Sequence, residues 1–174
     1  MSPGPEANRR ESLLDYADQL QRQSPAVEAQ VPSPELHLVT FALDREEFGI
    51  PIEQVREVIR VSDITRVPQA RQHVRGVANL RGRILAVVEI RTRMGLSAAE
   101  VTPRSRIVVV GIGQRMLGIL VDGVSQVVKV PVTTVTPPPE EVMSPATDYI
   151  TGVARWNSRL IILLDLEKVL QLPD

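Results

Sequence analysis

From Leu36 onward, hydrophobic residues gather in short runs that charged residues, glycine and proline interrupt. The runs are rich in Val, Ile and Leu and cover residues 36–43, 48–52, 83–90, 107–112, 117–121, 127–130 and 160–164. Short strands separated by frequent turn signals are typical of a β-sandwich or β-barrel. The pattern predicts only brief helical pieces, near residues 52–55, 91–96 and 167–172. The expected class is therefore all-β.

The first 35 residues follow a different pattern and are assigned to an N-terminal extension. Leu13, Ala17 and Leu20 recur at helical spacing, which predicts an amphipathic helix over about 6–23. Three prolines between residues 25 and 34 then interrupt a polar stretch, which indicates a linker. Two readings of the helix stay open: a frayed tail, or a docking helix for a partner.

An internal repeat is the most informative feature of the remaining chain. The segment 48–59 matches the segment 117–128, with Gly49 aligned to Gly118 and identical residues at several apolar positions. A second pair of segments, 74–90 and 150–166, also matches. Matched blocks that recur in the same order indicate a duplicated structural unit.

The second pair of segments aligns Gly76 with Gly152, so its offset exceeds that of the first pair by seven residues. The proline-rich stretch 137–145 is a natural place for this insertion, because loops absorb extra length at small cost. We therefore expect a domain over 36–172, built from one small barrel at about 36–100 and another at about 105–172. Units of this size are marginally stable alone, so we expect them to pack together and leave a seam.

Composition and charge narrow the class of protein. Aromatic residues make up 3% of the 174 residues and the formal net charge is −1, which disfavours a nucleic-acid surface. The chain has no cysteine, which excludes disulfides and zinc–thiolate sites. The N-terminus has no apolar run of signal-peptide length, and no run approaches a membrane span. We expect a cytoplasmic protein without membrane insertion.

No group of residues predicts an enzyme, a metal site or a cofactor. Gly111 and Gly113 lack the third glycine of a dinucleotide-binding loop, so a turn between strands is expected. The two histidines, His37 and His73, are far apart in sequence and lack metal-ligand spacing. Asp122 aligns with Glu53 of the first repeat, which suggests a structural role such as capping a short helix.

Positions that differ between the repeats are better functional candidates. The turn Asn79-Leu80-Arg81-Gly82 aligns with Arg155-Trp156-Asn157-Ser158. A turn would present the planar guanidinium of Arg81 to an acceptor-rich partner, although a solvated loop arginine is the alternative. Glu57, which aligns with uncharged Gln126, is expected to pair with Arg81 across adjacent strands.

The order of several motifs resembles the CheW family of chemotaxis coupling proteins over residues 36–172. The motifs are Phe41-Ala-Leu, Phe48-Gly-Ile, Val55-Arg-Glu-Val, Val67-Pro, Gly76-Val-Ala-Asn-Leu-Arg-Gly-Arg-Ile, Gly113-Gln, Gly118-Ile-Leu-Val-Asp-Gly-Val and Gly152-Val. The resemblance implies two packed five-stranded SH3-like barrels. It also implies a scaffold that performs no chemistry and joins the cytoplasmic tip of methyl-accepting receptors to a CheA-type histidine kinase, at receptor arrays.

The resemblance also implies which residues meet the receptor. Val55 is expected to be an apolar contact, Glu57 and Arg81 an orienting charged pair, and Asn79 their neighbour. Arg106 falls where relatives carry an apolar residue in the same groove, which leaves the identity of the receptor open. No motif marks residues that face the kinase.

Three other functions compete with this one. A CheW-like accessory protein would bind the receptor or the array but not the kinase, and would cap, localise or antagonise. A small enzyme or ligand-binding barrel would need a deep pocket with perturbed titratable groups. Nucleic-acid binding would require salt-dependent affinity.

Overall fold

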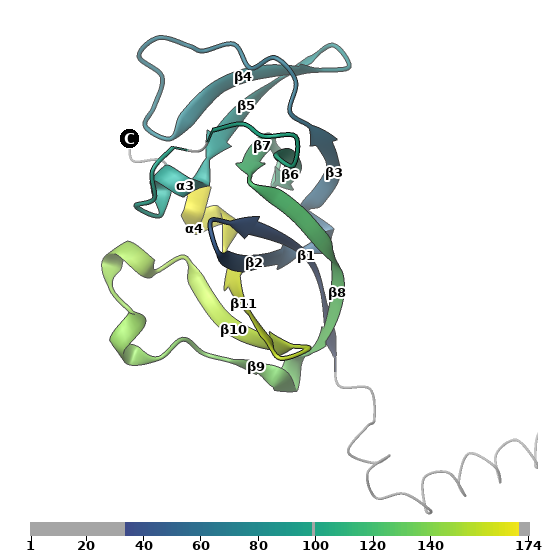
Figure 1. Cartoon of the computed structure of the whole chain (residues 1–174), viewed down its shortest axis with the longest axis vertical. Coiled ribbons are helices and arrows are strands. Elements are labelled where there is room, and N and C mark those ends of the chain that lie inside the picture. The colour runs from purple at the N-terminus through teal and green to yellow at the C-terminus, as the bar shows by residue number, and fades with distance from the viewer. Residues whose placement is uncertain (1–33, 99, 171–174) are drawn as a thin grey trace, which may run out of the picture. The chain divides into compact units, whose positions relative to one another are not determined.

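The structure is a computed structural model that describes residues 34–98 and 100–170. The predicted helix over about 6–23 lies outside the described residues. The described chain forms two sheets, and its helices are short (Figure 1). The all-β class is confirmed, and this architecture is consistent with the paired SH3-like barrels that the resemblance implies.

The larger sheet has six strands and the smaller has five. The order in the first sheet is β8 (Gly123–Pro131), β1 (Glu35–Leu43), β2 (Glu46–Pro51), β11 (Arg159–Leu164), β10 (Ile150–Trp156) and β9 (Val135–Thr136). The order in the second is β3 (Val55–Arg60), β6 (Arg106–Ile112), β7 (Arg115–Val121), β5 (Arg83–Glu89) and β4 (Val74–Leu80).

Helices in the described part of the chain span five residues or fewer. They are η1 (Ile52–Gln54), α3 (Ile90–Arg93), η2 (Val132–Thr134), η3 (Glu140–Val142), η4 (Pro145–Thr147) and α4 (Leu166–Leu170). The three predicted pieces coincide with η1, α3 and α4. The other three contain or follow prolines, whose fixed φ suits a tight turn and whose missing amide donor ends a strand.

The two repeats exchange their first hairpins. The β1–β2 hairpin of the first repeat lies in the sheet of β8 to β11, whereas β6–β7 of the second repeat lies with β3 to β5. The exchange is symmetric, because β2 runs parallel to β11 just as β7 runs parallel to β5. The expected barrels over about 36–100 and 105–172 therefore differ from the observed sheets, each of which combines strands of both segments.

Three apolar clusters explain the runs of hydrophobic residues. The main cluster lies between the sheets and takes residues from both, such as Phe41 of β1 and Val108 of β6. Each sheet also wraps a smaller cluster of its own, around Ile161 in the first sheet and Ile107 in the second. Strand β6 is apolar without alternation because both of its faces are covered.

Glycines shared by the repeats lie where chain segments approach closely. A Cβ atom at Gly49 would lie 2.9 Å from a methyl group of Ile161, and one at Gly118 would lie 2.7 Å from Ile107. Both distances are shorter than side-chain atoms tolerate. The fold therefore requires glycine at both of these equivalent positions.

Candidate functional site

Glu57 and Arg81 form the exposed ion pair on which the candidate site is built. An Nη1 atom of Arg81 donates to a carboxylate oxygen of Glu57 at 3.1 Å. The Arg81 side chain is 79% exposed and that of Glu57 is 26% exposed. The predicted pairing of these residues is confirmed.

The strands that carry the pair differ from the expectation. Glu57 lies on β3, one end strand of the five-stranded sheet, and Arg81 lies in the turn that follows β4, the other end strand. The pair therefore joins the two ends of the sheet and not adjacent strands. Thr65, which follows β3, also bonds to Val77 of β4 through two backbone hydrogen bonds of 2.8 Å. These contacts show that the sheet curls until its ends meet.

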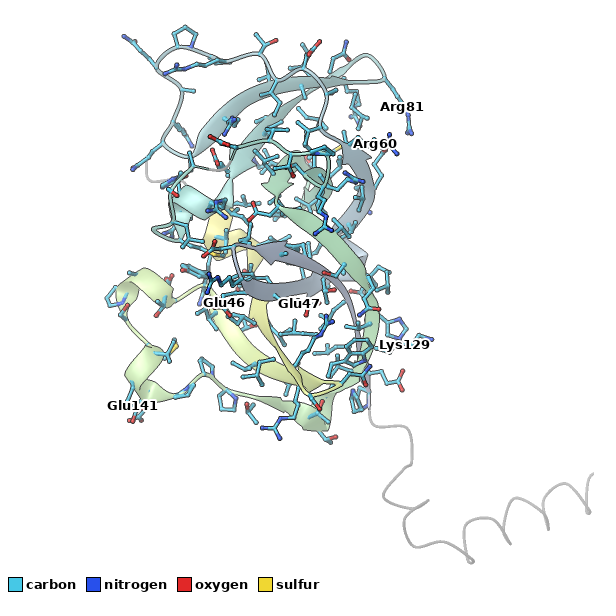
Figure 2. All side chains as sticks on the ribbon, viewed as in Figure 1. Glu46, Glu47, Arg60, Arg81, Lys129 and Glu141 are labelled. Atoms are coloured by element: carbon cyan, nitrogen blue, oxygen red, sulfur yellow. The ribbon has the colours of Figure 1, made fainter. Side chains whose placement is uncertain are left out.

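The turn between β4 and β5 holds the Arg81 backbone in an unusual conformation. Arg81 has φ 50° and Gly82 has φ 83°, and Leu80 pairs directly with Arg83. Positive φ at both central residues is the signature of a type I′ hairpin turn. The side-chain oxygen of Asn79 accepts a hydrogen bond from the Gly82 amide at 2.9 Å. Asn79 thus braces the turn, and the Arg81 side chain projects from the tip of the hairpin (Figure 2).

Val55 and Arg106 lie on neighbouring strands but at different heights. Val55, at the start of β3, is half-buried, pairs with Val110 and packs against the main core. Arg106, at the start of β6, pairs with Arg60 at the far end of β3. Val55 and Arg60 are five positions apart on β3, and their partners Val110 and Arg106 are four positions apart on β6, so the two levels are separated by about 13–17 Å. The ion pair and the turn therefore group Glu57, Asn79 and Arg81, whereas Val55 and Arg106 lie at opposite ends of the β3–β6 pairing.

Arg106 has a local role that its sequence position did not reveal. Its guanidinium donates to the backbone carbonyls of Pro103 and Ser105, both at 2.8 Å. It also lines an open cleft of about 490 Å³ next to the end of β7. At the position where the resemblance implies an apolar contact, this chain therefore has an arginine that bonds to the residues just before β6.

Asp122 does not cap a helix, in contrast to the expectation. Its carboxylate accepts hydrogen bonds from the Asp44 backbone amide at 2.7 Å and from the Arg91 guanidinium at 2.6 Å. Asp44 lies in the turn of the exchanged β1–β2 hairpin and Arg91 lies in α3, so Asp122 ties three elements together. The alignment with Glu53 could not predict this role. Asp122 meets Asp44 only because the β1–β2 hairpin lies in the sheet of the second repeat.

The described residues place no cluster of three or more His, Asp or Glu side chains where a metal ion could be held. Within the same residues, no helix has the length and apolar character to cross a membrane. The Gly111–Gly113 segment forms the end of β6 and the turn into β7, as expected.

Comparison with known proteins points to one family. A family model described as the CheW-like domain matches residues 37–174. The chemotaxis protein CheW of Klebsiella aerogenes is 35% identical over 130 residues, which cover 75% of this chain and 78% of that protein. The protein FrzA of Myxococcus xanthus is 31% identical and covers 79% of this chain and 87% of its own length.

A solved structure agrees with the sequence comparisons. The crystal structure of the scaffolding protein TtCheW from Thermoanaerobacter tengcongensis aligns with a TM-score of 0.73 at 29% sequence identity. The alignment covers 80% of this chain and 94% of that protein. Together, the duplicated all-β fold, the matched motifs and these relatives show that the chain belongs to the CheW-like family of chemotaxis scaffold proteins.

Proposed function

We propose that this protein is a non-enzymatic cytoplasmic scaffold that couples the tip of a methyl-accepting chemoreceptor to a CheA-type histidine kinase. The Glu57–Arg81 pair is the observation that supports receptor docking. It is exposed, it lies at the junction of the sheet's two ends, and its counterparts in the second repeat, Gln126 and Asn157, cannot form an ion pair.

The pair is better suited to recognition than to folding. An exposed ion pair contributes only about 0.2–1 kcal/mol to stability. The type I′ turn, in contrast, fixes the Arg81 backbone, so the guanidinium loses less freedom when it meets a carboxylate or carbonyl of a partner. Glu57 holds one side of the guanidinium, which leaves other N–H donors for the receptor. Val55 and Asn79 complete the proposed contact, with Arg106 opposite Arg60 at the end of β3.

Replacement of Arg81 tests the receptor-binding role. We expect Arg81→Ala to weaken binding to a purified receptor tip by about tenfold or more, about 1.4 kcal/mol, as at an interface hot spot. Its melting temperature should stay nearly unchanged, because the side chain is exposed. Calorimetric titration and thermal unfolding measure the two effects.

Arg159→Ala is the matched control for this experiment. Arg159 also forms an exposed arginine–glutamate contact, 3.5 Å from Glu47, on the corresponding hairpin of the second repeat. We expect the control to bind the receptor tip normally. An equal loss of affinity in both variants, or a melting temperature of Arg81→Ala lowered by many degrees, would contradict the assigned role.

A pull-down against the kinase and the receptor tip, separately and together, tests the coupling function itself. A ternary complex of the three proteins supports the scaffold. Receptor binding without kinase binding would instead favour the accessory protein that caps, localises or antagonises an array.

A further inference from the structure

The first repeat has an open cleft that the proposed receptor contact does not use. It lies beside the start of β4 and the end of β5, and its volume is about 690 Å³. Small-molecule sites commonly have volumes of about 300–1,000 Å³. The residues on which its chemistry depends are Arg66, Gln72, His73, Arg75, Glu89 and Thr92.

An ion pair between Arg75 and the buried carboxylate of Glu89 forms one wall of the cleft. An Nη1 atom of Arg75 lies 3.1 Å from a carboxylate oxygen of Glu89, whose side chain is only 6% exposed. The Arg75 side chain is 32% exposed, and the ion pair orients its guanidinium. A carboxylate that is removed from water needs a charged or hydrogen-bonding partner, and Arg75 provides one for Glu89.

His73 is held in place at the edge of the same cleft. Its backbone has φ 72°, which is uncommon for a residue other than glycine, and its carbonyl accepts a hydrogen bond from the Glu89 amide at 2.7 Å. The Thr92 hydroxyl donates to the Glu89 carbonyl at 2.9 Å and lies 2.8 Å from Nδ1 of His73. Since that hydroxyl proton is already used, Nδ1 of the neutral ring is the donor to Thr92.

Positive charge prevails in the cleft. Arg66 and Arg75 both line it, and Glu89 is the sole acidic residue among the lining residues. Burial lowers the pKa of His73, and the positive charge of Arg93 lowers it further. Guanidinium groups recognise phosphate through two parallel N–H donors, and the Gln72 amide and Thr92 hydroxyl offer further hydrogen-bonding groups.

The second repeat lacks this arrangement, although its backbone is equivalent. The Asp165 amide donates to the Tyr149 carbonyl at 2.8 Å, which reproduces the bond between Glu89 and His73. Tyr149 itself is 5% exposed and packs in the main core, and Thr151 replaces the guanidinium of Arg75. The polar cleft is therefore a property of one repeat and not a requirement of the fold.

We propose that this cleft binds a small anion that carries a phosphate group. Arg75 and Arg66 supply the charge, and Gln72, Thr92 and the ring of His73 supply polar contacts. This function is separate from receptor and kinase binding, and either proposal can fail without the other.

The two histidines of the chain allow a direct test with the full-length protein. Inorganic pyrophosphate is titrated at constant ionic strength while the ring C–H signals of His37 and His73 are followed by NMR. We expect a saturable shift of the His73 signals with a dissociation constant of about 1 mM or tighter. His37, whose side chain is 42% exposed at the start of β1, should not shift and serves as the internal reference.

Substitutions then show which side chains bind pyrophosphate. Arg66→Gln should weaken pyrophosphate binding by about tenfold. Gln72→Ala, a second exposed substitution in the same wall, should weaken it by a smaller factor. Arg159→Gln, in the other sheet, should leave the affinity unchanged. Thermal unfolding shows that each variant is folded.

Several results would overturn the proposal. One is the absence of a saturable His73 shift at about 20 mM pyrophosphate. Another is an equal shift of His37 and His73, or an equal loss of affinity in Arg66→Gln and Arg159→Gln, which would show nonspecific charge attraction. Citrate that binds as tightly as pyrophosphate would overturn the assignment of a phosphate group.

Discussion

The residues that carry the candidate site differ in how far their roles follow from sequence. The Glu57–Arg81 pair was expected because both charges occur in one repeat only, and the structure contains it. Its position at the meeting ends of a sheet was not expected, since ring closure depends on the pairing order of five strands. The contact of Asp122 with Asp44 and Arg91 was missed because it depends on the exchange of the β1–β2 hairpin.

His73 gives the chain a dependence of stability on pH. Burial lowers the pKa of His73 below 6.5, and the nearby positive charge of Arg93 lowers it further. Well above pH 6.5 the histidine is neutral in both the folded and the unfolded state and contributes no pH dependence. Below pH 6.5 the unfolded chain binds the proton first, so the free energy of unfolding falls until the lowered native pKa is passed.

We therefore expect the wild-type protein to lose more stability than His73→Gln between about pH 7.5 and pH 5. Glutamine cannot take up a proton but can still bond to Thr92. Urea unfolding of both proteins at the two pH values measures the difference. An equal loss in the two proteins would contradict the assignment of this pH dependence to His73.

At the scale of elements, strands that are buried on both faces were predictable. Strands β1, β5, β6, β7 and β11 contain continuous apolar runs because they lie between two apolar clusters. Strands β3, β4, β9 and β10 were not among the predicted runs. Strand β3 alternates apolar and charged residues, β4 and β10 contain glycine and polar residues, and β9 has two residues.

The pairing partners of the hairpins were not predictable from these runs. The parallel contact of β2 with β11 brings Phe48 beside Ile162, which lies more than a hundred residues later. A hydrophobic period specifies which face of a strand is buried but not which strand lies next to it. The sequence repeat predicts two similar units, but only the structure shows that these units exchange their first hairpins.

The approach of β4 to the segment after β3 depends on Gly76. A Cβ atom at this position would lie 2.2 Å from the backbone carbonyl oxygen of Thr65, which no side-chain rotation relieves. We expect Gly76→Ala to lower the free energy of unfolding by about 1–3 kcal/mol or more, because the backbone bridge between Thr65 and Val77 must shift. Chemical denaturation measures the loss.

Gly123→Ala is the matched control. A Cβ atom there would lie 3.7 Å from the nearest atom, the carbonyl oxygen of Arg104, which is an ordinary contact. We expect this variant to unfold at nearly the wild-type denaturant concentration. Equal stability of the two alanine variants would show that the close approach to Thr65 does not require glycine.

At the scale of the whole described domain, the exchange makes the two sheets mutually dependent. Each sheet loses a hairpin if the chain is divided between the repeats, and the main core loses residues from both sides. We expect fragments 34–104 and 105–174 to lack folded structure when produced separately. Amide chemical-shift dispersion in NMR spectra measures this directly.

The two fragments produced together should recover the dispersed spectrum, because every strand is then present. The intact chain should unfold in one cooperative transition, with the same midpoint by fluorescence of Trp156 and by circular dichroism. A fragment that folds alone, or two separate transitions, would show that the sheets are stable independently of the exchange.

The hairpin exchange also means that one repeat cannot complete its strand pairings alone. A chain with one repeat could satisfy these pairings only with a second copy of itself, each copy lending its hairpin to the other. In a chain that holds both repeats the association is intramolecular, so it does not depend on concentration. In a single chain the two halves can carry different side chains at equivalent places, as at His73 and Tyr149. The exchange thus makes the two halves inseparable in folding while their side chains at equivalent places differ.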